Sequence, residues 1–306
     1  MRVFITGASG HIGLPVVREL RAAGHEVVGL ARSEESAKKV AAAGGQVLRG
    51  DLDDLAGLSA AARAADGVVH LAFKHDLALL KGDFAGALSA ELRAVETIGE
   101  ALAGSGKPFV NTSGTMLLAH SVHGRACTED DAGQEGGNPR VASEKLSERL
   151  AGRGVRASIV RLAPTVHSSL DRHGFIPMMV AAARKNGFAA FVGEGNARWP
   201  AVHTLDAARL YRLALEKAPA GFRAHAAAEE GVPFRAIAEA IGRGLGLPAR
   251  SITPEQAPGA LGGFVGLVAQ LDNPTSSTRT REVLGWKPAH ADLLADIAEG
   301  HYLTAR

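Results

Sequence analysis

The chain has 306 residues, enough for one large doubly wound unit with an appended lobe or for two domains of ordinary size. Its 34 Lys and Arg residues nearly balance 32 Asp and Glu residues in an interspersed pattern, so the sequence carries no basic pattern for nucleic acid or an anionic membrane. Hydrophobic residues make up 46%, which excludes a disordered or fibrous protein, and the single cysteine, Cys127, excludes an intramolecular disulfide and a multi-cysteine metal site.

Short β-like runs alternate with helix-length segments through the first half of the sequence. The runs predict six strands, at residues 2–6, 26–31, 46–49, 67–72, 108–112 and 155–162. The segments between them predict helices near residues 12–22, 34–43, 55–65, 83–103 and 140–152. This alternation predicts an α/β fold of the Rossmann type, with a doubly wound parallel sheet covered on both faces.

The rhythm changes after residue 163, where loops become rich in glycine and proline. Helices are predicted near residues 175–186, 204–217, 233–244, 256–270 and 290–302. No Ser/Gly linker separates the two halves. We therefore expect residues 1–163 to form a dinucleotide-binding domain, and residues 164–306 to form mainly a smaller substrate-binding lobe packed on it.

A glycine-rich turn follows the first predicted strand and opens the first helix. It reads Thr-Gly-Ala-Ser-Gly-His-Ile-Gly over residues 6–13. Glycines allow a tight turn and close approach of a pyrophosphate, and the helix N-terminus offers free N–H groups and partial positive charge. An ordinary strand-to-helix turn is the alternative. The expected cofactor contacts are Gly7, Ser9, Gly10, His11, Ile12 and Gly13.

The ends of the second and third strands concern the adenosine half of a dinucleotide. Ala31 stands where NAD sites often have an acidic residue, and Arg32 and Ser33 follow it. Arginine binds a 2′-phosphate bidentately, so NADP(H) is expected to be preferred, with NAD(H) possible. A solvated surface arginine is the alternative. Asp51, followed by Leu52, is a candidate adenine contact, and Asp53 is expected to cap the next helix.

Together these motifs resemble the extended short-chain dehydrogenase/reductase superfamily, in its NAD(P)-dependent epimerase/dehydratase-like branch. The resemblance covers nearly the whole chain and continues through residues 69–72, 110–114, 160–167, 199–206 and 284–288. It implies that Leu71, Ala72, Thr112 and Pro164 also line the cofactor. Several motifs in the right order indicate the fold more strongly than they indicate the substrate.

The catalytic residues implied by the resemblance are only partly present. Members with the full set have a Ser or Thr after the fifth strand, and a Tyr four residues before a Lys on the next helix. Lys145 matches that Lys, but Val141 stands at the Tyr position, and residues 105–165 contain no tyrosine. The chain therefore resembles an atypical member. The resemblance implies that Ser113 faces the nicotinamide and that Lys145 binds its ribose, although Ser113 is alternatively a loop-stabilising hydroxyl.

Histidines are the candidates for the missing proton donor. His167 lies in a segment that lines the active site in similar proteins, and His173 follows it, although structural or exposed roles are the alternative for both. His70 is expected in the core. The spacing of His120, His123 and His203 is unlike that of metal ligands on one element, so no metal is predicted.

The leading hypothesis is an NADP(H)-dependent oxidoreductase that transfers hydride to a small carbonyl or related substrate. The alternatives are a non-enzymatic NADP(H)-binding sensor or scaffold, and a nucleotide-sugar epimerase or dehydratase. The apolar residues of the lobe fit a substrate lining or plain core packing; they include Phe175, Met178, Met179, Phe188 and Phe191.

Location and partners are expected from the same sequence. Gly7 comes too early for a signal-peptide core, and the apolar stretch at 262–271 is too short to span a bilayer, so a cytoplasmic protein is expected. The expected partner is a small-molecule substrate, with no nucleic acid and no membrane. A homodimer is possible.

Overall fold

A parallel sheet of seven strands forms the larger part of the computed structural model, which describes residues 1–119, 121–122, 124–134 and 137–304. The strand order is β10-β6-β5-β4-β1-β2-β3, which confirms the predicted Rossmann-type fold. The strands are β1 (Arg2–Thr6), β2 (Glu26–Ala31), β3 (Gln46–Arg49), β4 (Gly67–His70), β5 (Pro108–Gly114), β6 (Arg156–Leu162) and β10 (Arg223–Ala226).

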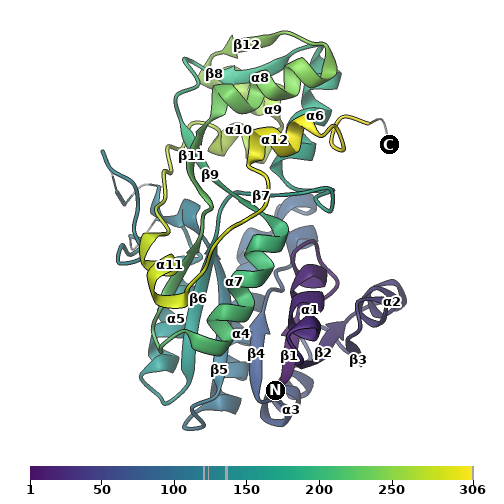
Figure 1. Cartoon of the computed structure of the whole chain (residues 1–306), viewed down its shortest axis with the longest axis vertical. Coiled ribbons are helices and arrows are strands. Elements are labelled where there is room, and N and C mark those ends of the chain that lie inside the picture. Colours follow the sequence, from purple (N-terminus) through teal and green to yellow (C-terminus); the bar gives the residue numbers. More distant parts are fainter. Residues whose placement is uncertain (120, 123, 135–136, 305–306) are drawn as a thin grey trace.

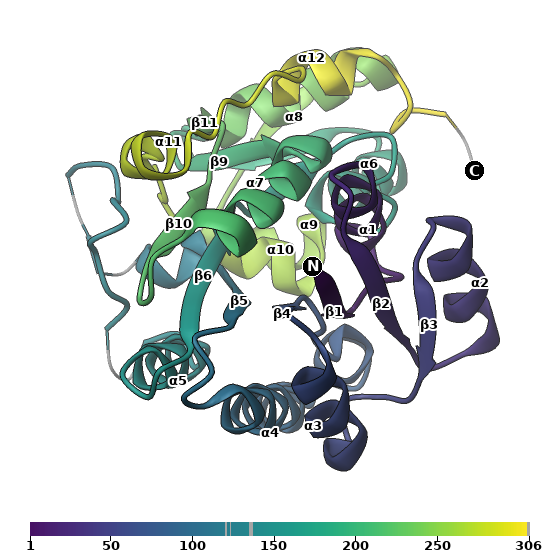
Figure 2. The same cartoon turned by 60° about the horizontal axis from the view of Figure 1, so that its bottom comes forward.

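Helices cover both faces of this sheet (Figure 2). One face carries α1 (Gly13–Ala22), α2 (Glu34–Ala42) and α7 (Thr204–Lys217), and the other carries α3 (Leu55–Ala64), α4 (Phe84–Leu102) and α5 (Val141–Ala151). Because successive side chains of a strand point to opposite faces, Val3 and Ile5 enter the first core and Phe4 enters the second. Buried strands of this kind read as nearly continuous apolar runs, which is why the sequence revealed them.

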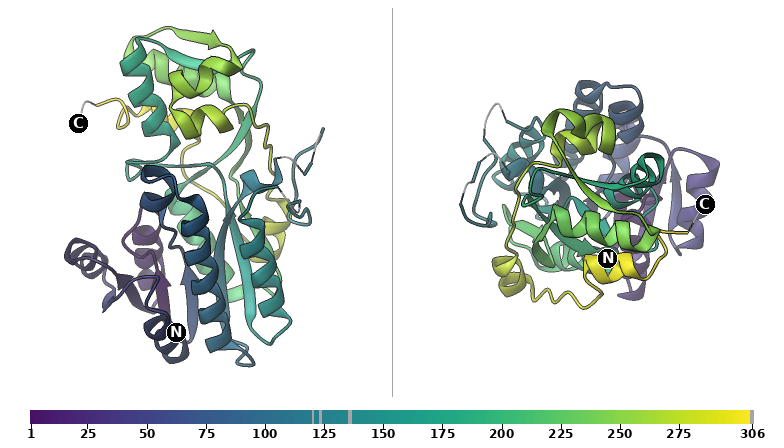
Figure 3. Two further views of the ribbon diagram at one scale, coloured as in Figure 1. Left: turned by 180° about the vertical axis from the view of Figure 1, so that it is seen from behind. Right: turned by 90° about the horizontal axis from the view of Figure 1, so that it is seen from above.

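A smaller lobe stands at the carboxyl end of the sheet (Figures 1 and 3). It contains a three-stranded sheet ordered β11-β9-β7 and a β8–β12 pair. The strands are β7 (Thr165–His167), β8 (Ala189–Val192), β9 (Arg198–His203), β11 (Glu229–Pro233) and β12 (Ala249–Ile252). The helices are α6 (Phe175–Asn186), α8 (Phe234–Leu245), α9 (Ala257–Leu261), α10 (Gly263–Val268) and α12 (Leu293–Ala298). Trp199 and Phe234 pack edge to face at the centre of its core.

Four further short helices lie in the connecting segments: η1 (Asp76–Leu80), η2 (Thr115–Leu118), η3 (Pro254–Gln256) and α11 (Thr278–Leu284). Part of the second half of the chain lies with the large sheet. Leu210 and Leu213 of α7 belong to the core on the β1 face, and β10 pairs with β6 in parallel. Trp286 joins the same core and donates from Nε1 to the carbonyl of Asp206. The sixth strand ends at Leu162, and the chain then crosses between lobe and sheet.

Two predicted helices differ in extent from the observed ones. The segment at 256–270 is divided at Gly262, whose φ of 86° and ψ of 150° are not helical, so α9 and α10 are separate. The segment at 290–302 contains the shorter α12, which Asp292 caps by accepting a hydrogen bond from the Ala295 N–H. Among the described residues, no helix has the length and apolar character that crossing a bilayer requires.

Candidate functional site

The turn between β1 and α1 has room for glycine alone at two positions. Gly7 has φ of +70°, and a Cβ there would lie 2.8 Å from the backbone nitrogen of Ala72. A Cβ on Gly13 would lie 2.1 Å from the carbonyl oxygen of Gly7. The turn is therefore packed directly against the chain leaving β4 on one side and against its own helix on the other.

The first turn of α1 is open to a ligand. Ile12 occupies the N-cap, no side chain caps the helix among the described residues, and the first turn contains no acidic residue. Uncapped N–H groups at a helix N-terminus favour an anion. Ser9 and Gly10 are accessible on the same turn, and the Gly10 N–H donates to the Gly7 carbonyl at 3.0 Å.

His11 ties this turn to the lobe. Its Nε2 lies 2.9 Å from Oγ1 of Thr204, the first residue of α7, and its Nδ1 lies 3.9 Å from Oδ1 of Asp171. Burial, with the neighbouring His167, His173 and His203, lowers the pKa of His11 to about 4. The ring is therefore neutral near pH 7 and adds no charge for a phosphate.

Arg32 lies where β2 leads into α2 and remains largely exposed. Its Nη1 is 3.1 Å from Oδ2 of Asp76, an exposed ion pair that a phosphate can compete with. Ser33 caps α2 by accepting from the Ser36 N–H. Arg49, at the end of β3, donates from Nη1 to the Ser33 carbonyl at 2.7 Å, so a second guanidinium lies at this corner, which the sequence analysis missed.

The acidic motif after β3 divides its roles differently from the prediction. Asp51 accepts the Asp53 N–H at 2.7 Å and is exposed, while Leu52 is buried. The prediction that Asp53 caps α3 is wrong. Asp54 accepts the Gly57 N–H at 2.9 Å because it immediately precedes the helix, and Asp53 pairs instead with Lys74.

Thr112 and Ser113 lie at the carboxyl end of β5, on opposite faces of the sheet. Thr112 donates to the His70 carbonyl at 2.6 Å, so it accepts from the Tyr211 hydroxyl, 2.8 Å away. Ser113 is buried, and its Oγ has no hydrogen-bond partner in the described part of the chain. An unpartnered buried hydroxyl at the end of a central strand fits a group that receives a polar ligand.

The nearby side chains of Tyr211 and His70 are unsuited to proton transfer, because burial shifts their pKa values far from neutral. Burial raises the pKa of Tyr211 far above its ordinary value, so its hydroxyl stays protonated. His70 is a core residue, as predicted: its Nδ1 lies 2.8 Å from Oγ1 of Thr6, and burial lowers its pKa to about 3.

Helix α5 presents an apolar side chain at the position of the absent tyrosine. Val141 packs in a small cluster with Leu117, Leu118 and Cys127. Lys145 follows one turn later and is half-buried. A buried bidentate pair between Glu144 and Arg161 of β6, at 2.8 and 2.6 Å, holds the helix against the sheet.

Arg140, which directly precedes α5, brings positive charge to this end of the sheet. Its Nη2 donates to Oε1 of Glu91 at 2.8 Å and to the Thr112 carbonyl at 3.2 Å. Its guanidinium carbon lies 4.9 Å from the centre of the Phe73 ring. The sequence analysis missed this residue, because neither its spacing nor its neighbours resemble a motif.

His167 lies on β7 and faces the lobe. Val166 packs against the core that contains Val3 and Ile5, and alternation along the strand turns His167 the other way, where its Nδ1 is 2.9 Å from Oδ2 of Asp296. Pro164 lies half-buried between β6 and β7.

His203 contacts two other histidines: its ring lies 5.6 Å from the ring of His167, edge to face, and stacks on the ring of His290 at 4.6 Å. His173 is exposed. His120 and His123 lie outside the described residues. The apolar candidates of the lobe also separate, since Met179 and Phe191 are buried in its core while Phe175, Met178 and Phe188 are partly exposed.

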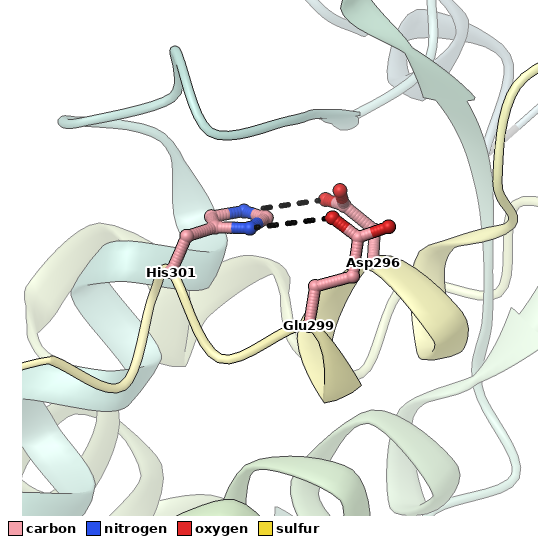
Figure 4. A group of neighbouring side chains, drawn as sticks. All are labelled: Asp296, Glu299 and His301. Carbon is pink, nitrogen blue, oxygen red and sulfur yellow. Dashed lines mark ion pairs between the residues drawn. The ribbon is translucent and has the colours of Figure 1, made fainter.

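Asp296, Glu299 and His301 gather at the end of α12 (Figure 4). His301 Nε2 is 3.6 Å from Oδ2 of Asp296, and Nδ1 is 3.9 Å from Oε2 of Glu299. The two carboxylates thus face different nitrogens of one ring. The absence of a metal stays a prediction.

Comparison with known proteins places these features in a family. Residues 3–226 match the model of the NAD dependent epimerase/dehydratase family. An uncharacterised protein of Schizosaccharomyces pombe is 45% identical over 302 residues, with 99% of this chain and 100% of the relative covered. A Saccharomyces cerevisiae protein is 40% identical over 306 residues, with 99% and 100% covered. A 3-diazoavenalumate denitrifying reductase of Streptomyces is 30% identical over 307 residues, with 95% and 97% covered.

Solved structures show the same fold. A dTDP-glucose 4,6-dehydratase of Streptomyces venezuelae, solved with NAD bound, superposes with a TM-score of 0.77 at 20% identity, with 99% of this chain and 98% of that chain covered. At this identity the likeness establishes the shared architecture of sheet and lobe, and the chemistry of the site has to be argued from its residues.

Proposed function

Because the chain belongs to the NAD-dependent epimerase/dehydratase family, we propose that it is an NADP(H)-dependent oxidoreductase that reduces a small carbonyl or related group. The relative named as a reductase and the nicotinamide cofactor in structural neighbours support this reaction class. Gly7, Gly10, Gly13 and the open first turn of α1 would hold the pyrophosphate.

The proposal rests on one observation: two groups that can bind a ligand lie along the same carboxyl edge of the sheet. The uncapped start of α1 follows β1, and the unpartnered Ser113 hydroxyl ends β5, two strands away in the order β5-β4-β1. An extended dinucleotide spans such a distance at the strand carboxyl ends of doubly wound folds. A bound nicotinamide supplies the hydride there.

The chain's own residues would then orient the reactants. Ser113 would donate a hydrogen bond to the substrate oxygen, and Lys145 would hold the nicotinamide ribose. Leu71, Ala72, Thr112 and Pro164 would line the nicotinamide half. Val141 has no proton to give, so this enzyme differs from relatives with tyrosine at the step that protonates the substrate oxygen. His167, which faces Asp296, would reach the substrate only after a rearrangement of β7.

The preference for NADP(H) rests on the corner formed by β2 and β3. Ala31 places no carboxylate there, while Arg32 and Arg49 provide two guanidinium groups. Their present partners, Asp76 and Glu34, are exposed side chains whose ion pairs hold them weakly. A 2′-phosphate with charge near −2 competes effectively for such groups.

Consumption of NADPH with a panel of aldehydes, ketones and quinones tests the proposed reaction. Stoichiometric oxidation of NADPH and formation of the alcohol are expected for at least one carbonyl class. Tight NADPH binding without turnover on any member would favour the sensor or scaffold, an alternative that the apolar setting of Val141 supports. Binding of a nucleotide diphosphate sugar would favour the epimerase or dehydratase.

A further inference from the structure

Arg140 occupies a defined position between the ends of two central strands. Its Nη2 contacts the carbonyl of Thr112, the residue before Ser113, and its guanidinium covers the face of Phe73, which follows Ala72. Ala72 in turn touches Gly7 of the glycine-rich turn. Arg140 therefore lies at the site of the proposed reaction and not on a distant surface.

The guanidinium is held from one side. Glu91 of α4 is only 1% exposed and contacts Nη2 at 2.8 Å, and the Ser143 hydroxyl donates to the same carboxylate oxygen at 3.3 Å. Nε of Arg140 and Oε2 of Glu91 are both buried and have no hydrogen-bond partner among the described residues. Glu91 thus fixes one edge of the guanidinium.

The other edge is available. Nη1 has no hydrogen-bond partner in the described part of the chain, and the Arg140 side chain keeps 22% of its surface exposed. Ser113 Oγ, on the residue next to the contacted carbonyl, also lacks a partner among the described residues. Arg140 Nη1 and Ser113 Oγ are therefore two unused donors near the carboxyl end of β5.

From these contacts we propose that Arg140 binds a substrate oxygen that carries or develops negative charge, with Ser113 as the second donor. The inference rests on the proposed function for the identity of the reaction, and it names the oxygen-binding group that the Val141 position lacks. An arginine stays protonated throughout the physiological range, so it stabilises an anionic oxygen without giving up its own proton. During carbonyl reduction the hydride from NADPH would add to the carbonyl carbon, and the π electron pair of the C=O bond would move to the oxygen beside Arg140. Solvent water would then protonate this alkoxide and leave hydroxide.

A purely structural pair would behave differently when each partner is changed. In a structural role, Arg140→Gln and Glu91→Gln both break the same contact and have similar effects. In the proposed role they have opposite effects, because Glu91→Gln removes the carboxylate that competes for the guanidinium, while Arg140→Gln removes the binding group. The double variant leaves no buried charge unpaired, which protects the fold.

The test is binding of acetate and benzoate, as simple carboxylate probes, measured by calorimetry on the full chain with and without NADPH. The wild type is expected to bind at least one probe, Glu91→Gln to bind it several-fold more tightly, and both Arg140→Gln and the double variant to bind at least tenfold more weakly. Arg140→Lys should be intermediate. Arg153→Gln is the matched control, because Arg153 pairs with Glu100 at the opposite end of the same helices.

Two results would overturn the inference: no binding of either probe by the wild type, or equal binding by the wild type and Arg140→Gln. NADPH affinity, measured on the same samples, reports on the proposed function separately. Probe binding that depends on Arg140 in a protein without NADPH affinity would retain the anion site and reject the oxidoreductase.

Discussion

Gly13 has the least room of the residues in the cofactor turn. A methyl group there would meet the Gly7 carbonyl at 2.1 Å and the Ala8 backbone at 2.8 Å, so the turn must shift before alanine fits. We expect Gly13→Ala to cost about 1–3 kcal/mol of unfolding free energy and to reduce NADPH affinity. Gly259→Ala is the control, because nothing lies within 4 Å of its Cβ position. Urea denaturation and NADPH titration give both quantities, and unchanged values for Gly13→Ala would reject the assignment.

The neighbouring side chains of Asp171 and His11 make contributions to stability that change with pH in opposite directions. Burial raises the folded pKa of Asp171 to about 6 from 3.8, so its contribution to stability is complete below pH 3.8 and is lost as pH rises through 6. Burial lowers the pKa of His11 from 6.5 to about 4, so its contribution is complete above pH 6.5 and is lost as pH falls through 4.

Variants separate these two contributions. Asp171→Asn should gain stability relative to the wild type between pH 4 and 7, by up to about 3 kcal/mol, because the amide has no charge to bury. His11→Gln should also become more stable than the wild type over this range, and its advantage in unfolding free energy should grow as pH falls. The measurement is unfolding free energy at several pH values, and a pH-independent difference from the wild type would contradict the assignment for either residue.

At the scale of elements, the buried pair between α5 and β6 holds α5 against the sheet. Arg161 is fully buried, and its bidentate partner Glu144 is nearly so. Removing one partner leaves an uncompensated buried charge, so Glu144→Ala should lower the unfolding free energy by about 3–5 kcal/mol. Glu100→Ala, which removes the exposed partner of Arg153, should change it by about 1 kcal/mol or less. Equal effects of the two variants would contradict this role.

The six N-terminal strands were predictable because they are short β-like runs between turns, and their alternation with helices predicts a parallel sheet. Strand β10 was not, because its four residues are identified as part of the sheet only by pairing with β6, more than sixty residues earlier. The lobe strands are similarly short, and several lie against helices that obscure their alternation. Gly262 broke a predicted helix through its backbone conformation alone.

The turn at Gly7–Gly13 was predictable from the sequence for the same local reason, since its glycines are close together and their spacing has a physical meaning. Arg140 and Glu91 were not, because 49 positions separate them and only the packing of α4 on α5 joins them. Tyr211 reaches Thr112 from a helix in the second half of the chain, which no spacing rule connects to β5.

Lys145 tests whether helix α5 faces the proposed cofactor. If it holds the nicotinamide ribose, Lys145→Ala should weaken NADPH binding by roughly 1.5–3 kcal/mol, the contribution of one charge-assisted hydrogen bond. Lys185→Ala, in the last turn of α6, should leave the affinity unchanged. Fluorescence titration compares them, and equal affinities would place Lys145 away from the cofactor.

For the whole molecule, the crossing of the chain between sheet and lobe makes cofactor binding and stability inseparable. His11 joins the glycine-rich turn to α7, and α7 contacts both the large sheet and β9, so a dinucleotide bound at the turn would contact the point where both parts meet. A ligand bound only by the folded state stabilises it by mass action. NADPH should therefore raise the temperature of one unfolding transition of the whole chain, whereas two transitions that respond separately would show that sheet and lobe unfold independently.

The most direct test of the central claim is titration of the wild type and the double variant Ala31→Asp, Arg32→Ala with NADPH and with NADH. The wild type should bind NADPH more tightly by on the order of tenfold or more, since one bidentate charge-assisted contact exceeds the 1.4 kcal/mol that tenfold requires. The double variant should reverse the order, because it gains a ribose acceptor and loses a phosphate partner. Equal affinity of the wild type for both nucleotides, or binding of neither, would contradict the account.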